Sequence, residues 1–141
     1  MGDIKNKLNV MVIEDDDMTR KLLVIELKRR GHNVLEYTDA AAAMLDLERD
    51  KKPIDAAIVD LMNMGYGGNI GEYLRKKAEY KDVAIFFYTA LTKQQFNTKI
   101  LDIPNTHYIH KEPGSIKVMI EKIESLFNDQ PQKNFSNGEN G

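Results

Sequence analysis

The stretch VMVIEDDDMTR, residues 10–20, decides the fold of this chain. Four apolar residues, three of them β-branched, come first and predict a short buried strand. Four carboxylates follow without a gap, from Glu14 to Asp17. A buried strand cannot continue through so many charges, so they mark its carboxyl end. Asp16 and Asp17 suit the start of a helix, where a carboxylate accepts free backbone N–H groups and meets the positive end of the helix dipole.

The rest of the chain repeats this order of an apolar run followed by an amphipathic one. We expect strands over residues 9–13, 33–38, 55–60, 83–89 and 106–111. We expect helices over residues 18–31, 40–49, 69–80, 93–101 and 115–127. Gly31 is placed to end the first helix, and Asp39 to cap the second. Such regular alternation predicts one α/β domain over residues 9–127, built as a parallel sheet with helices on both faces. Residues 1–8 are expected to be a tail, and the polar residues 128–141 a disordered tail.

The composition excludes several classes of function. The chain has 141 residues, a net charge of −2 and a hydrophobic share of 42%, which suit one domain with one core. It has no cysteine, which excludes disulfides, thiol catalysis and cysteine-bound metals. Its 20 basic residues are scattered, so nucleic acid is not an expected partner. No apolar run is long enough to cross a membrane and no signal peptide is visible, so we expect a cytoplasmic protein.

Residues that can carry chemistry stand at the ends of the expected strands. They are Glu14, Asp15, Asp60, Thr89 and Lys111. Because the carboxyl ends of parallel strands meet at one edge of the sheet, these side chains are expected to face one crevice. Three carboxylates in one pocket repel each other unless a cation joins them, and oxygen ligands without His or Cys favour Mg²⁺ over zinc. Lys111 and Thr89 are suitable partners for phosphoryl oxygens, so the set predicts a phosphoryl group on a carboxylate.

Four stretches together resemble the receiver domain of two-component response regulators. They are VMVIEDD (10–16), AAIVDLMNMGYGG (56–68), IFFYTA (85–90) and YIHK (108–111). The resemblance implies a flavodoxin-like (βα)₅ doubly wound sheet with the strand order 2-1-3-4-5. It also implies that Asp60 accepts a phosphoryl group from a histidine kinase or a phosphotransfer protein, and that phosphorylation changes contacts with an output protein.

The same resemblance assigns roles to the other residues. Asp15 and Asp60 would bind Mg²⁺ or Mn²⁺ directly, Glu14 mostly through a bound water, and the backbone carbonyl of Met62 would be a further ligand. Thr89 and Lys111 would hold the phosphoryl oxygens. Tyr108 would be the aromatic switch residue, which turns inward when Thr89 moves toward the phosphate.

The loop after Lys111 departs from the family. Most members have proline directly after the lysine, with a cis peptide bond between the two, whereas this chain has HKEPG over residues 110–114. A cis bond before a residue other than proline costs about 3–4 kcal/mol. The sequence leaves open whether the Lys111–Glu112 peptide is cis, or runs trans and shifts Lys111.

Three hypotheses of different classes follow. The first is a stand-alone phosphoryl-accepting receiver, a monomer or weak dimer, that is no enzyme beyond its own phosphorylation and dephosphorylation. The second is a binding module that kept the fold but works without phosphorylation. The third is a metal-dependent phosphatase of the haloacid dehalogenase type, in which the nucleophilic aspartate is followed two residues later by a second acid. Asp60 is followed by LMN, so that second acid is missing.

Overall fold

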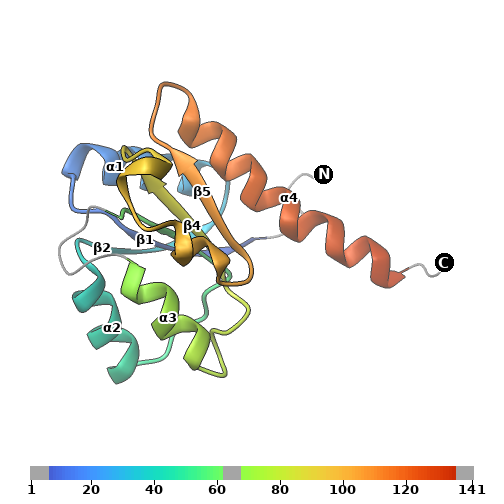
Figure 1. The fold of residues 1–141 in the computed structure, drawn as a ribbon. Coiled ribbons are helices and arrows are strands. Elements are labelled where there is room, and N and C mark those ends of the chain that lie inside the picture. The colour runs from blue at the N-terminus through green and yellow to red at the C-terminus, as the bar shows by residue number, and fades with distance from the viewer. Residues whose placement is uncertain (1–6, 62–67, 136–141) are drawn as a thin grey trace.

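Five parallel strands in the order β2-β1-β3-β4-β5 form the centre of the molecule (Figure 1). The computed structural model describes residues 7–61 and 68–135. The strands are β1 (Asn9–Ile13), β2 (Asn33–Tyr37), β3 (Ala56–Val59), β4 (Ala84–Thr89) and β5 (Thr106–His110). All four pairs of neighbouring strands are parallel, which confirms the predicted flavodoxin-like sheet and its strand order.

Within residues 7–61 and 68–135, four α-helices cover the two faces of this sheet. They are α1 (Asp17–Arg29), α2 (Ala40–Arg49), α3 (Gly68–Lys76) and α4 (Ser115–Phe135). Helices α1 and α4 lie on one face and α2 and α3 on the other (Figure 1). Among the described residues, no helix is both long enough and apolar enough to cross a membrane.

The central strands are apolar on both sides because both faces are covered. Every residue of β3 and β4 is buried. Since successive side chains of a strand point to opposite faces, each strand contributes to two cores. Val59 and Phe87 belong to the core under α2 and α3. Ile58 and Phe86 belong to the core under α1 and α4. The two cores fix the register of the sheet, and with it the edge where the strands end.

The predicted helix ends are confirmed where the sequence carried a cap. Asp16 accepts a hydrogen bond from the Thr19 N–H at the start of α1. Asp39 does the same for the Ala42 N–H at the start of α2. Gly31 follows α1 with a φ of 93°, the left-handed conformation that glycine adopts without strain.

The prediction of one α-helix over residues 93–101 is wrong. The structure has two short 3₁₀-helices there, η1 (Lys93–Gln95) and η2 (Thr98–Asp102). The backbone restarts between them, because the Asn97 side chain accepts the Lys99 N–H and opens a new turn. Gln95 likewise accepts the Thr92 N–H and closes the first turn on itself. Local side-chain bonds of this kind compete with a continuous helix.

Two further helix ends differ from the prediction. Helix α3 ends at Lys76, not at residue 80, because tight turns carry the chain on to Tyr80, which is buried and hydrogen-bonded to the Lys52 backbone. Helix α4 continues to Phe135, past the expected end at Phe127.

Candidate functional site

The candidate site lies at the carboxyl edge of the sheet, where the hydrogen-bonded ladder runs one residue beyond the strands. The backbone N–H of Glu14 bonds to Tyr37 O, and that of Asp60 to Ile13 O, both at 3.1 Å. The N–H of Lys111 bonds to Thr89 O at 2.8 Å. Three of the predicted site residues are therefore held by the sheet itself, and their side chains leave a rigid frame in defined directions.

Three carboxylates come together at this edge, as the sequence predicted. One oxygen from each of Glu14, Asp15 and Asp60 lies within 4.8 Å of the others. Glu14 and Asp60 are only 2% and 5% exposed, whereas Asp15 is open to solvent. Donors that are all carboxylate oxygens suit a hard divalent ion such as Mg²⁺ or Mn²⁺, and a crowded negative corner needs one. The residues thus fit the expected metal. The Met62 carbonyl, the other predicted ligand, lies outside the described residues.

Lys111 supplies the positive charge of the site. Its Nζ lies 2.9 Å from Glu14 Oε1 and 3.3 Å from Asp60 Oδ2. Burial by itself would lower the pKa of Lys111, but the hydrogen bond to Glu14 and the charge of Asp60 outweigh it and raise that pKa above its usual value. Lys111 is therefore a cation whenever the site is assembled.

Glu14 is the most constrained of the carboxylates. Its Oε2 accepts the Asp16 N–H at 3.1 Å while its Oε1 faces Lys111, and Arg20 donates to its backbone carbonyl at 2.9 Å. Burial raises the pKa of Glu14 to about 7; the Asp60 charge adds to this effect and the Lys111 hydrogen bond opposes it. The raised pKa of Glu14 thus reflects mainly its burial, with the neighbouring charge of Asp60 as a smaller cause.

The two predicted switch residues both bond to the backbone of Leu91. Thr89 is fully buried, and its Oγ1 accepts the Leu91 N–H at 3.1 Å. Tyr108 donates its hydroxyl proton to Leu91 O at 2.6 Å, and its ring stacks on Phe96 with the centroids 5.7 Å apart. A movement of Thr89 would therefore disturb the residue to which Tyr108 is bonded. Their switch roles stay predictions.

Sequence reasoning missed two residues behind the site. The Tyr88 hydroxyl lies 2.7 Å from Ser115 Oγ, and both side chains are buried under the loop that follows Lys111. The Lys111–Glu112 peptide is trans, which answers the question that the sequence left open. No local pattern could have paired Tyr88 with Ser115, since they are 27 residues apart.

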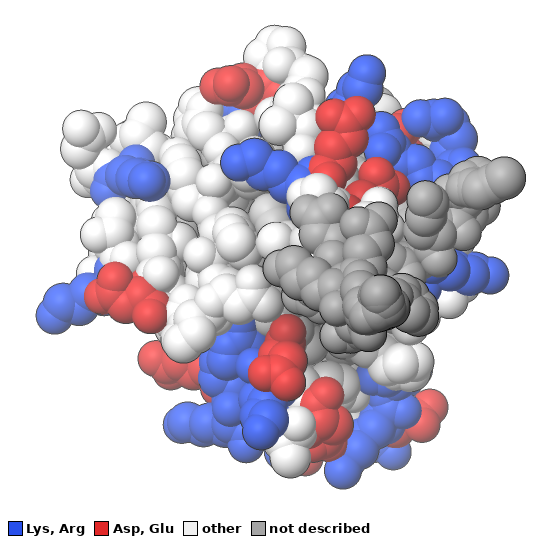
Figure 2. All heavy atoms as spheres, turned by 90° about the vertical axis from the view of Figure 1, so that its right-hand side faces the viewer, with Lys and Arg blue, Asp and Glu red and all other residues white. Residues whose placement is uncertain are grey.

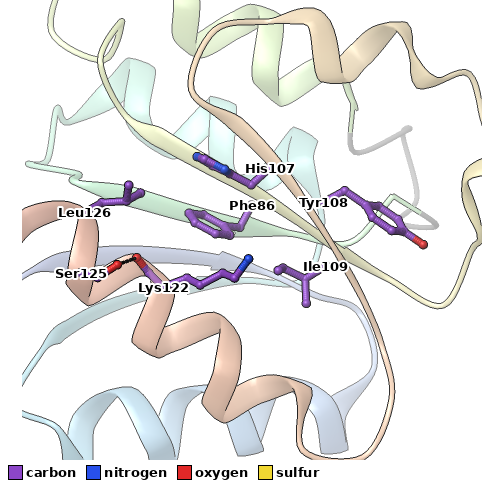
Figure 3. A pocket seen from close by; sticks show the side chains of 7 residues that line it. All are labelled: Phe86, His107, Tyr108, Ile109, Lys122, Ser125 and Leu126. Carbon is purple, nitrogen blue, oxygen red and sulfur yellow. Dashed lines mark hydrogen bonds between the residues drawn. The ribbon is translucent and has the colours of Figure 1, made fainter.

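Apart from the carboxylate site, a hollow of about 320 Å³ lies between β5 and α4. Figure 3 shows the side chains around it, with the Phe86 and His107 rings stacked at 4.4 Å and Tyr108 pointing away from the other labelled residues. Among the described residues, the candidate metal cluster does not include any of its lining side chains. The hollow and the carboxylate cluster are thus separate features of the molecule.

Comparisons with known proteins agree with the geometry. The chain is 29% identical over 116 residues to a cyclic di-GMP phosphodiesterase of Thermotoga maritima; the match covers 82% of this chain but only 30% of that protein. The chemotaxis response regulator CheY4 of Vibrio cholerae has the same fold, with a TM-score of 0.74 and 18% identity over 86% of this chain and 100% of that one.

The response regulator TrrA of Thermotoga maritima, solved in complex with Mg(2+)-BeF, also shares the fold. Its TM-score is 0.69, with 23% identity over 85% of this chain and 99% of that chain. The family model of the response regulator receiver domain matches residues 10–124, which run from the second residue of β1 into α4 and include the described carboxylate site. The chain belongs to the response regulator receiver domain family.

Proposed function

We propose that this protein accepts a phosphoryl group on Asp60 from a histidine kinase or a phosphotransfer protein and passes the signal on through protein contacts. The observation that supports this most is the position of Asp60. It is buried, it lies 3.3 Å from the Lys111 ammonium, and it shares a corner with Glu14 and Asp15. A carboxylate beside an ammonium group and two further acids that can hold a metal ion suits the role of nucleophile. The positive charges around it would stabilise the negative charge on the phosphoryl oxygens during the reaction.

In the proposed reaction, an oxygen of Asp60 forms a bond to phosphorus as the phosphorus–nitrogen bond of a phosphohistidine breaks. The histidine nitrogen keeps the electron pair of that bond. Asp15 and Asp60 would hold Mg²⁺ or Mn²⁺, with Glu14 acting through a water, and the ion would supply positive charge for the phosphoryl oxygens. Lys111 orients the same oxygens from the other side. The chain acts on its own carboxylate, so turnover of an external substrate is not part of the proposal.

The response to phosphorylation is proposed to pass through Thr89. Its hydroxyl would donate to a phosphoryl oxygen, and a turn of Thr89 toward that oxygen would strain or break the bond that it now accepts from the Leu91 N–H. The Leu91 carbonyl is the partner of Tyr108, so this exchange would alter the hold on the Tyr108 ring and on the surface around η1 and β5.

The exterior suits a protein partner. On α1, three large apolar side chains are exposed at the spacing i, i+4, i+7: Met18, Leu22 and Ile25. Helix α1 begins two residues after Asp15, so this stripe starts beside the site. On the face in Figure 2, basic and acidic side chains are intermingled around a broad uncharged area. The stripe favours an apolar protein surface as the partner. The intermingled charges do not favour the backbone of a nucleic acid.

The test is phosphorylation by acetyl phosphate, read as intact mass with and without Mg²⁺. We expect one phosphoryl adduct that requires Mg²⁺ and is absent in Asp60→Asn. Asp55→Asn is the control, since Asp55 caps the start of the sheet through the Asn9 N–H at 2.8 Å. A folded protein that binds Mg²⁺ and takes no adduct would reject the proposal in favour of a phosphorylation-independent binding module.

A further inference from the structure

We propose that Tyr88 is a positioning residue for Lys111, acting from behind the loop of residues 111–115. This inference deepens the proposed function and rests on it. It is based on two contacts of Tyr88. Its hydroxyl bonds to Ser115 at the far end of the loop, and the face of its ring lies against the Lys111 ammonium.

The loop after Lys111 has little of its own to hold it. The sheet ends with the bond from the Lys111 N–H to Thr89 O. Glu112, Pro113 and Gly114 are exposed, and Gly114 turns the chain with a φ of 82°. Ser115 is the next buried residue and the first of α4. The direction of the Lys111 side chain thus depends on how firmly Ser115 fixes the far end of the loop.

Ser115 uses its whole hydrogen-bonding capacity on that task. Its Oγ donates to the Glu112 carbonyl at 2.6 Å and accepts the Glu112 N–H at 3.1 Å. A hydroxyl has one proton and two lone pairs, so one lone pair is left. The Tyr88 hydroxyl, 2.7 Å away, fills it as a donor. The loop is therefore bonded to a residue of the central strand β4, and a displaced loop would leave a buried hydroxyl without its partner.

The ring of Tyr88 makes the second contact. Lys111 Nζ lies 5.6 Å from the ring centroid, within the range of a cation–π interaction. The ammonium thus contacts Glu14, Asp60 and the face of the Tyr88 ring. A lysine ammonium is a point charge on a flexible stem, so it needs such boundaries to stand at one place. Tyr88 is only 4% exposed, so the ring itself is held by the core.

The test compares Tyr88→Leu and Tyr88→Phe with a buried tyrosine at the opposite edge of the sheet. Tyr80→Phe is the matched control, since Tyr80 is 2% exposed and its hydroxyl bonds only to the Lys52 backbone among the described contacts. We expect Tyr88→Leu to slow Mg²⁺-dependent phosphorylation by acetyl phosphate about tenfold, since a misplacement of about 1 Å costs up to ~10²-fold. Tyr88→Phe keeps the ring and is expected to lose less. The rates are compared at saturating Mg²⁺ for each variant, since Tyr88 is not a proposed ligand and a change in Mg²⁺ affinity is thereby kept out of the comparison.

Repeating Tyr88→Leu in the Lys111→Ala background separates positioning from general damage. If Tyr88 acts through Lys111, its replacement has no further effect there. Wild-type rates in both Tyr88 variants, or an equal loss in the two backgrounds, would overturn the inference.

A second readout does not depend on phosphorylation. The ¹⁵Nζ resonance of Lys111 should show slow hydrogen exchange in the wild type and faster exchange in Tyr88→Leu, with Tyr80→Phe unchanged. If the wild type takes no phosphoryl group but this difference is present, the proposed function fails while the positioning role of Tyr88 stands. If the exchange is the same in all three proteins, the positioning role is rejected whatever the outcome of phosphorylation.

Discussion

Lys111 Nζ is closer to Glu14, at 2.9 Å, than to Asp60, at 3.3 Å. The lysine is therefore shared between the carboxylate proposed to help hold the metal and the carboxylate proposed to react. Each of these acids is buried, and a buried charge is tolerated only with a partner. Two buried carboxylates share one lysine here, so the site favours the binding of a second cation. A metal ion at this corner would offset the charge of Glu14, and Lys111 would then be free to follow a phosphoryl group on Asp60.

The raised pKa of Glu14 predicts a pH dependence of stability. Its usual pKa is 4.5, and the fold raises it to about 7. Between these values the folded protein holds more protons than the unfolded chain, so the Glu14 contribution to the free energy of unfolding falls as the pH rises from about 4.5 to about 7. Urea unfolding at several pH values, without metal, measures this. Glu14→Gln should remove the slope that belongs to this residue.

Saturating Mg²⁺ should have a similar effect on that slope, because a bound cation favours the ionised carboxylate. Identical pH profiles for the wild type and Glu14→Gln would show that Glu14 does not hold the extra proton.

Removal of Lys111 should destabilise the protein and make it dependent on metal. Lys111→Ala leaves Glu14 and Asp60 buried without their shared cation, and breaking such a pair costs about 3 kcal/mol. Because the lost charge is the same one that Mg²⁺ can replace, added Mg²⁺ should stabilise this variant more than it stabilises the wild type. Thermal unfolding with and without Mg²⁺ measures both effects. Lys51→Ala is the control, since Lys51 pairs with Glu79 on the surface. An equal Mg²⁺ response in the two variants would contradict the prediction.

The sheet and the site could be predicted from the sequence because their signals are local. Apolar runs bounded by charged or turn residues define the buried strands, and the polar residue after each run marks the edge where Glu14, Asp60 and Lys111 meet. The helix over residues 93–101 was wrong because bonds of Thr92 and Asn97 over two or three residues outweighed a weak helical pattern.

The contacts that hold Lys111 in place could not be predicted, because they are not local in the sequence. They depend on Tyr88 and Ser115, which lie far apart in the chain and meet only after the sheet and α4 have packed. The sequence around Lys111 shows only that the usual proline is missing. In the structure the Lys111–Glu112 peptide is trans, and the Ser115 hydroxyl bonds to the loop at Glu112.

His32 is predicted to be a structural residue of the α1–α4 face. Its Nδ1 accepts the Leu8 N–H at 3.1 Å, so its proton is on Nε2, which donates to Glu124 at 2.8 Å. His32→Leu fills similar space but leaves a buried N–H without a partner, which costs about 2 kcal/mol. His110→Leu, at a half-exposed histidine, should cost about 0.5 kcal/mol or less. Chemical denaturation measures the free energy of unfolding of both variants. An equal decrease in the two would show that the buried contacts of His32 do not stabilise the fold more than those of His110.

The apolar stripe on α1 predicts where the phosphodonor protein docks. Leu22→Glu and Ile25→Glu place charges on side chains that are 48% and 61% exposed, so the fold should tolerate them. We expect phosphotransfer from a phosphorylated histidine kinase or phosphotransfer domain to slow at least tenfold, since a buried charge at an interface is left without a partner. Phosphorylation by acetyl phosphate should not change, because that small donor needs no docking surface.

Leu45→Glu is the matched control for docking. Leu45 is 66% exposed and lies on α2, on the other face of the sheet from the α1 core. The prediction requires this variant to keep both rates. Equal slowing by Leu45→Glu would point to a general charge effect, and unchanged protein phosphotransfer in Leu22→Glu and Ile25→Glu would move the docking surface away from α1.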